Sequence, residues 1–255
     1  TIMVDMEVTT TSIDGGAAYG IHVFGDIDAN GKLENSGLID VSGVAAHGIY
    51  GDGALSGEII NSSEIINSSS PQGIMVNVDG LTTNASANGV GIFQEKLSGE
   101  GKIVNNGNIT VNAVSYTSAS LAGVVANTIG ESGSISNSGT IEINASAHTV
   151  SAIGFGVKAG DVDGNITNSG AISIDAVLST GIFVENDLSG TITNTSDGTI
   201  NVNGSGSNTT GSAAGIDIGN IIEGGLVSNL GKIDVEASAF ATSSNDTKAT
   251  AYGII

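Results

Sequence analysis

Cysteine, tryptophan and arginine are all absent from the chain, and proline occurs once, at Pro71. Without cysteine there is no disulfide framework and no direct indication of the compartment in which the protein works. Only six lysines stand against 26 acidic residues, and the resulting formal net charge of −20 excludes a surface that tracks nucleic-acid phosphates. No apolar run approaches the roughly 20 residues that a membrane-spanning helix needs, so we expect no membrane insertion of this segment.

Despite its acidity, the chain has the apolar content of a folded protein. Hydrophobic residues make up 39% of the sequence, and isoleucine and valine recur along its whole length. A disordered acidic chain lacks the apolar surface to form a core, whereas this one can bury a continuous aliphatic core.

One phrase, Gly-x-Ile-x-Asn-x-Gly-x-Ile with small variations, recurs along the chain. Its seven copies begin at Gly31, Gly57, Gly101, Gly133, Gly164, Gly190 and Gly225. A second phrase accompanies it: a small or polar residue, then glycine, then isoleucine or valine, as in Tyr19-Gly20-Ile21. Together with a Leu-Ser-Gly marker, these phrases divide each repeat into three extended segments joined by turns.

The copy that begins at Gly133 indicates which secondary structure the phrase forms. Ile135, Asn137, Gly139 and Ile141 alternate with serine and threonine. Alternation with period two predicts strands with one buried face, since a helix would need apolar residues at three- and four-residue spacing. We therefore predict an all-β fold, a right-handed parallel β-helix of about eight coils, each with three strands of roughly four or five residues.

The domain organisation follows from this repeat. Residues 1–255 are expected to form a single solenoid domain, and because the chain opens and stops inside coils we expect it to be a piece of a longer protein. The motif EIINSS occurs at 58–63 and again at 64–69, so we expect an insertion at about 64–72. One enlarged coil and two small coils both fit residues 57–100.

The asparagine of the phrase holds the same place in all seven copies. These residues are Asn35, Asn61, Asn105, Asn137, Asn168, Asn194 and Asn229. An asparagine at a tight bend can bond the local backbone, and stacked amides can also bond one another from coil to coil. We therefore interpret the series as structural rather than as a glycan or metal site.

Two acidic turns are candidates for calcium. Asp26, Asp28 and Asn30 form the motif D-x-D-x-N, and Asp161, Asp163 and Asn165 repeat it. Oxygen-rich loops of this kind open calcium-binding sites, although neither motif has the glutamate that closes an EF-hand loop.

No catalytic constellation is predicted. The chain has no phosphate-binding loop, its three histidines are scattered, and carboxylates such as Glu34, Glu142 and Glu236 occupy single outward positions. The nine phenylalanines and tyrosines, without tryptophan, offer few aromatic platforms for sugars. A polysaccharide-processing β-helix enzyme is therefore the least favoured class, and we expect no enzyme.

The copies GSISNSGTIEINA, from Gly133, and GNITNSGAISIDA, from Gly164, resemble the repeats of autotransporter passenger domains and related large surface proteins of Gram-negative bacteria. The resemblance covers essentially the whole chain and implies a right-handed β-helix at the bacterial cell surface that projects adhesive or protective loops.

Two function classes follow from that resemblance and from the variable loops at 114–121, 204–213 and 238–250. In the first, the chain is an adhesive stalk whose edge loops meet cell-surface glycans or proteins. In the second, it is a surface-layer or filament subunit that packs against copies of itself. Both place the protein outside the cell.

Overall fold

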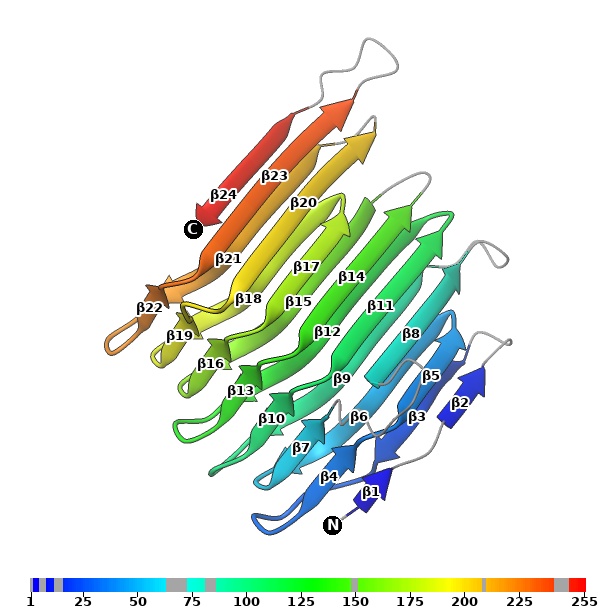
Figure 1. Cartoon of the computed structure of the whole chain (residues 1–255), viewed down its shortest axis with the longest axis vertical. Helices are drawn as coiled ribbons and strands as arrows, with labels where there is room; N and C mark the ends of the chain where they lie inside the picture. Colours follow the sequence, from blue (N-terminus) through cyan, green and yellow to red (C-terminus); the bar gives the residue numbers. More distant parts are fainter. Residues whose placement is uncertain are drawn as a thin grey trace.

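The computed structural model describes residues 2–4, 8–11, 16–62, 73–80, 86–147, 151–207, 210–240 and 248–255. The fold is a parallel β-helix in which three eight-stranded sheets run along the length of the rod (Figure 1). Every strand pair between coils is parallel, and each coil contributes one strand to each sheet. Within the described ranges, no helix is long and apolar enough to cross a membrane.

The first sheet is built from the phrase that contains the asparagine. Its strands are β1 (Ile2–Val4), β4 (Lys32–Asn35), β7 (Glu58–Asn61), β10 (Lys102–Asn105), β13 (Ser134–Asn137), β16 (Asn165–Asn168), β19 (Thr191–Asn194) and β22 (Leu226–Asn229). The second sheet contains β2 (Val8–Thr11), β5 (Leu38–Gly43), β8 (Gly73–Gly80), β11 (Asn108–Ser115), β14 (Thr140–Ala147), β17 (Ala171–Ala176), β20 (Thr199–Ser207) and β23 (Lys232–Phe240).

The third sheet closes each coil. Its strands are β3 (Ala17–Val23), β6 (Ala45–Leu55), β9 (Ala87–Leu97), β12 (Ser118–Ile129), β15 (Ser151–Val162), β18 (Leu178–Leu188), β21 (Gly211–Ile221) and β24 (Ala249–Ile254). The prediction of a parallel β-helix with about eight coils is confirmed. The expected strand length was wrong for the second and third sheets, whose strands reach nine and 12 residues.

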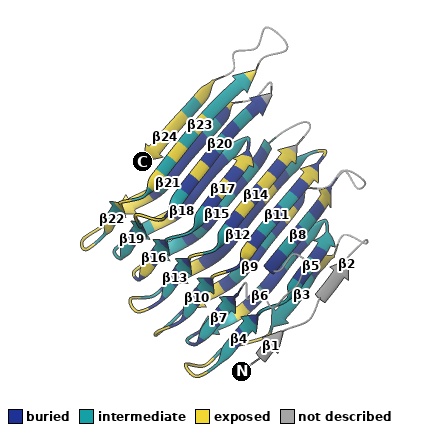
Figure 2. Cartoon of the chain, in the orientation of Figure 1, coloured by how far each residue is buried: buried dark blue, intermediate teal, exposed yellow. Residues whose placement is uncertain are grey.

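The core is a stack of like residues from successive coils. Ile103 of β10 pairs in register with Ile59 of β7 and with Ile135 of β13, and all three side chains are almost completely buried. Side chains alternate between the interior and the solvent along each strand, so the apolar half of the phrase fills the rod (Figure 2). Burial of each isoleucine is worth about 1.5–3 kcal/mol relative to an exposed one.

A glycine column explains why the third-sheet strands are long. The glycine of the second phrase faces inward against the isoleucine column of the second sheet. In β12, a Cβ on Gly123 would overlap Cγ2 of Ile141 and lie 2.7 Å from the carbonyl oxygen of Gly156 in the next coil. Because glycine permits this close approach, β12 pairs with its neighbours in the same register on both sides of Gly123.

The irregular segment between Gly57 and Gly101 contributes one strand to each sheet, namely β7, β8 and β9. Its described part is therefore one enlarged coil rather than two small ones. The insertion predicted at about 64–72 lies outside the described residues.

Candidate functional site

The seven asparagines of the phrase stand in one column at the ends of the first-sheet strands. In each step, Nδ2 of one asparagine donates to Oδ1 of the asparagine in the following coil. The Nδ2–Oδ1 distance is 2.9 Å between Asn35 and Asn61, and 2.8 Å in the step from Asn137 to Asn168. The first six members are almost completely buried, whereas Asn229 is exposed. We call this series the asparagine column.

The second amide hydrogen in the asparagine column bonds the backbone. Nδ2 of Asn105 donates to the carbonyl oxygen of Thr140 at 3.4 Å, and that of Asn61 donates to the carbonyl oxygen of Asn108 at 3.1 Å. Oδ1 of Asn35 is buried and has no hydrogen-bond donor among the residues that the structure describes. The column therefore ties the first sheet to the second at the same corner of successive coils.

The two candidate calcium motifs occupy the same turn of the coil but do not meet. Asp26, Asp28 and Asn30 line one shallow depression between β3 and β4, in which Lys32 also takes part. Asp26 accepts the backbone N–H of Ala54 in the next coil (2.7 Å, Oδ1). Asp26 therefore has a structural role in this turn, because its carboxylate holds the backbone of the next coil.

The second motif lies several coils further along the rod. Asp161 pairs in register with Thr128 inside β15, and Asn165 begins β16. Asp163 lies in the turn between these strands, where its Oδ1 accepts the Ser189 hydroxyl at 2.6 Å. Within the described ranges, no three His, Cys, Asp or Glu side chains gather in a way that could hold a metal. Calcium binding stays a prediction.

Aromatic side chains gather on the outer surface of the third sheet. Two outward columns flank the inward-facing glycine and isoleucine of the second phrase, and together we call them the aromatic face. The first column contains Tyr19, His47, Val90, Ala122, Phe155, Thr180, Ala214 and Tyr252. The second contains His22, Tyr50, Phe93, Val125, Lys158, Phe183 and Asp217.

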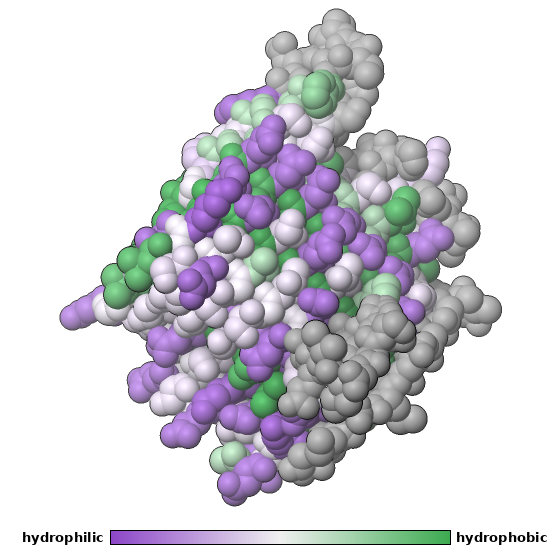
Figure 3. Space-filling model, viewed as in Figure 1, coloured by the Kyte–Doolittle hydropathy of each residue, from purple (hydrophilic) through white to green (hydrophobic). Residues whose placement is uncertain are grey.

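Burial confirms that the columns lie outside the core. Ala122, Val125 and Ala214 are only 4–7% exposed, yet they do not belong to the internal hydrophobic cluster. Their neighbours on the aromatic face therefore cover them. The face seen in Figure 3, which carries the first and second sheets, is by contrast largely covered by hydrophilic side chains.

Sequence reasoning missed this face. In the second phrase, the repeated glycine and isoleucine face inward. The residue before the glycine and the residue after the isoleucine face outward, and these two positions vary from copy to copy. Aligning the copies on that glycine would have brought Tyr50, Phe93 and Phe183 together. These columns hold six of the nine phenylalanines and tyrosines of the chain.

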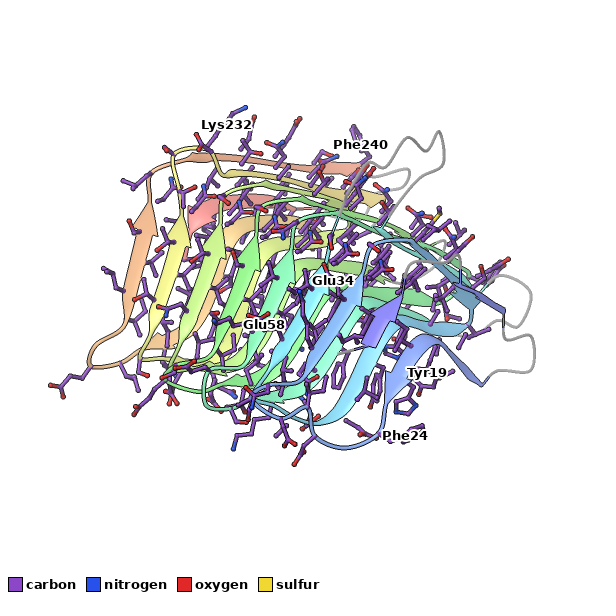
Figure 4. All side chains as sticks on the ribbon, turned by 60° about the horizontal axis from the view of Figure 1, so that its bottom comes forward. Tyr19, Phe24, Glu34, Glu58, Lys232 and Phe240 are labelled. Atoms are coloured by element: carbon purple, nitrogen blue, oxygen red, sulfur yellow. The ribbon has the colours of Figure 1, made fainter. Side chains whose placement is uncertain are left out.

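Six rings at the N-terminal end of the aromatic face form a contiguous group, which we call the ring cluster. Its members are Tyr19, His22, Phe24, His47, Tyr50 and Phe93. Tyr50 and Phe93 are stacked with centroids 4.7 Å apart and planes 9° apart. Tyr19 stacks on His22 at 4.7 Å, and Phe24 contacts His22 while remaining 79% exposed. Tyr19 and Phe24 project outward from the same end of the rod (Figure 4).

Two carboxylates border the ring cluster. Asp52 faces His22, with Oδ2 and Nε2 3.5 Å apart, and its Oδ1 accepts the backbone N–H of Gly25 at 2.8 Å. The Gly25 bond, and then His22, lower the pKa of Asp52, so the carboxylate is charged at neutral pH. Glu95 is held by Nδ2 of Asn127 at 2.8 Å.

Two rings of the cluster, His47 and Tyr50, have shifted pKa values. Burial, and then the neighbouring His22, lower the pKa of His47, so that its imidazole is uncharged at pH 7. Burial raises the pKa of Tyr50, and Tyr19, Asp52 and Glu95 raise it further. His47 and Tyr50 are thus uncharged at pH 7, beside the charged carboxylate of Asp52.

A second ring group lies further along the aromatic face. Phe155 and Phe183 stack with centroids 5.1 Å apart, and Nζ of Lys158 lies 5.5 Å and 5.8 Å from the two centroids. The same Nζ is 3.0 Å from Oε2 of Glu185. The ammonium group of Lys158 thus contacts both rings and forms an ion pair with Glu185.

No protein-family model, curated protein or solved structure matches this chain. What the site can do therefore follows from its geometry. Stacked rings beside fixed carboxylates offer an apolar, electron-rich contact surface of negative sign, which suits molecular recognition.

Proposed function

We propose that the chain is a non-enzymatic segment of an extracellular bacterial stalk, related in role to autotransporter passenger domains, that presents its connections and outer faces for adhesion. The proposal draws on the resemblance of the repeat to those domains. It is supported by a rod that keeps one cross-section while the connections at its corners differ from coil to coil.

The observation that best supports the proposal is the varying length of the connection between the second and third sheets. It is a single residue between β5 and β6 and between β17 and β18, but eight residues, 241–248, between β23 and β24. The strands on either side keep their pairing with neighbouring coils throughout. A scaffold that tolerates such changes along one edge suits the display of loops, because function in solenoids concentrates where insertions are accepted.

The charges support recognition rather than catalysis. Glu34 is paired with Lys32 at 2.8 Å, and Glu142 accepts a bond from Asn144 at 3.2 Å. Both lie on outward strand positions and bond to close neighbours on the same strand. Opposed carboxylates across a cleft, which glycoside hydrolysis uses, are not formed by these two residues.

Immunogold electron microscopy of intact native cells tests the proposal. Antibodies against the chain are expected to label the outer surface without permeabilisation, as projections separated from one another. Labelling that requires permeabilisation would refute the extracellular stalk. A continuous lattice or long filaments of label would instead favour the self-assembling subunit.

A further inference from the structure

The group around Lys158 shows what the aromatic face can bind. Its ammonium lies within 6 Å of two stacked rings and forms an ion pair with Glu185. Attraction of a cation to ring faces is worth about 0.5–1 kcal/mol at exposed sites and more when water is excluded, and a nearby carboxylate adds to it.

The ring cluster has the same components except for the cation. Tyr50 and Phe93 stack more closely and more nearly parallel than Phe155 and Phe183 do. Two carboxylates border these rings: Oδ2 of Asp52 lies 3.5 Å from Nε2 of His22, and Glu95 follows Phe93 by two residues on β9. Within the described residues, no lysine is placed over these rings.

The charged groups near the cluster leave room for an external cation. His22 is the only basic side chain that is described in contact with Asp52. Lys96 follows Glu95 on β9 but makes no ion pair with a described residue, so the carboxylate of Glu95 is not neutralised by it.

We propose that the ring cluster, with Asp52 and Glu95, is a binding site for an arginine side chain on a basic protein partner. The planar guanidinium can stack on the rings while its fork of N–H donors meets a carboxylate, which the point charge of a lysine does less well. The net charge of −20 attracts such a partner over a longer range and repels polyanions. This inference deepens the proposed recognition role, but binding in solution does not depend on where the protein resides.

Titration with short peptides, followed by NMR of the aromatic ring signals at pH 8 and low salt, tests the site. The probes are an acetylated, amidated peptide of alternating glycine and arginine, the same peptide with lysine, and the same peptide with citrulline. Citrulline keeps the shape of arginine but lacks its charge. The arginine peptide is expected to shift the signals of Tyr19, Tyr50 and Phe93. Its affinity is expected to be several-fold higher than that of the lysine peptide and at least tenfold higher than that of the citrulline peptide.

Matched variants separate the site from general electrostatics. Tyr50→Leu and Asp52→Asn are each expected to weaken the arginine peptide by about fivefold or more. Asp197→Asn removes the same charge from an exposed turn, and Phe183→Leu alters the ring pair that Lys158 already occupies; both are expected to change affinity by less than twofold. Thermal melting monitored by circular dichroism checks that each variant is folded, and Phe93→Leu replaces Tyr50→Leu if the latter is not.

Several outcomes would overturn the proposal. Equal losses in Asp52→Asn and Asp197→Asn would show diffuse attraction without a site. Equal binding of the citrulline peptide, or full binding by a folded Tyr50→Leu protein, would exclude ring recognition of a cation. Shifts of the same rings by a neutral oligosaccharide, without an effect of the arginine peptide, would reassign the surface to carbohydrate. Failure of the stalk proposal would appear in the microscopy and would leave these titrations unchanged.

Discussion

Replacing Asn137 by alanine tests whether the asparagine column holds the rod together. The side chain of Asn137 lies in the middle of the column, where it accepts from Asn105 and donates to Asn168, both at 2.8 Å. Alanine would leave Nδ2 of Asn105 without that acceptor and Oδ1 of Asn168 without that donor, in a place where all three residues are 1% exposed.

The magnitude follows from these two orphaned groups. A buried polar group that loses its partner costs about 1–3 kcal/mol. Nδ2 of Asn105 keeps a longer bond to the carbonyl oxygen of Thr140 at 3.4 Å, which reduces the cost on that side. We therefore expect Asn137→Ala to lower the free energy of unfolding by about 2–4 kcal/mol.

Asn144→Ala is the matched control. Asn144 lies on the outer face of β14, where it is exposed and donates to Asn112 at 3.0 Å and to Glu142 at 3.2 Å. Because water can replace these bonds, we expect a change of about 0.5 kcal/mol or less. Urea unfolding followed by circular dichroism measures both variants. Equal destabilisation by the two substitutions, or none by Asn137→Ala, would refute a structural role specific to the buried column.

Further predictions concern the glycine column, pH and calcium. Gly123→Ala is expected to destabilise the protein by about 2 kcal/mol or more, because the added Cβ overlaps the Ile141 side chain and the Gly156 carbonyl oxygen. Gly253→Ala, whose added Cβ meets nothing within 4 Å, is expected to have little effect on the same urea curve. The lowered pKa of His47 means that its contribution to stability is complete above 6.5 and is lost as the pH falls below that value. The melting temperature should therefore drop between pH 7 and 5 in the native protein by more than in His47→Phe. Calcium is expected to raise the melting temperature, less so in Asp28→Asn; calorimetry with no heat and no shift would exclude the ion.

The sequence predicted the first sheet and the core better than the third sheet. The alternation around Ile135 and Ile141 defines which side chains enter the rod, so period and coil number could be inferred without coordinates. The length of the third-sheet strands could not, because the pairing that resumes in register after Gly123 depends on the close approach of the backbone in neighbouring coils.

The aromatic face escaped prediction for a related reason. Tyr50 and Phe93 are 43 positions apart, and their stacking depends on the register between β6 and β9 across an enlarged coil. Neither residue stands out in its own segment. Only the alignment of coils turns scattered rings into a surface.

The asparagine column has a direction. Every described amide in it donates toward the C-terminal coil, so the amide dipoles add rather than cancel along the rod. The first acceptor of the column, Oδ1 of Asn35, has no donor in the described part of the chain. Each asparagine in the middle of the column both accepts and donates, so a coil inserted with its asparagine in register would continue the column by one further step. The rod could therefore be lengthened by whole coils without leaving a buried amide unpaired.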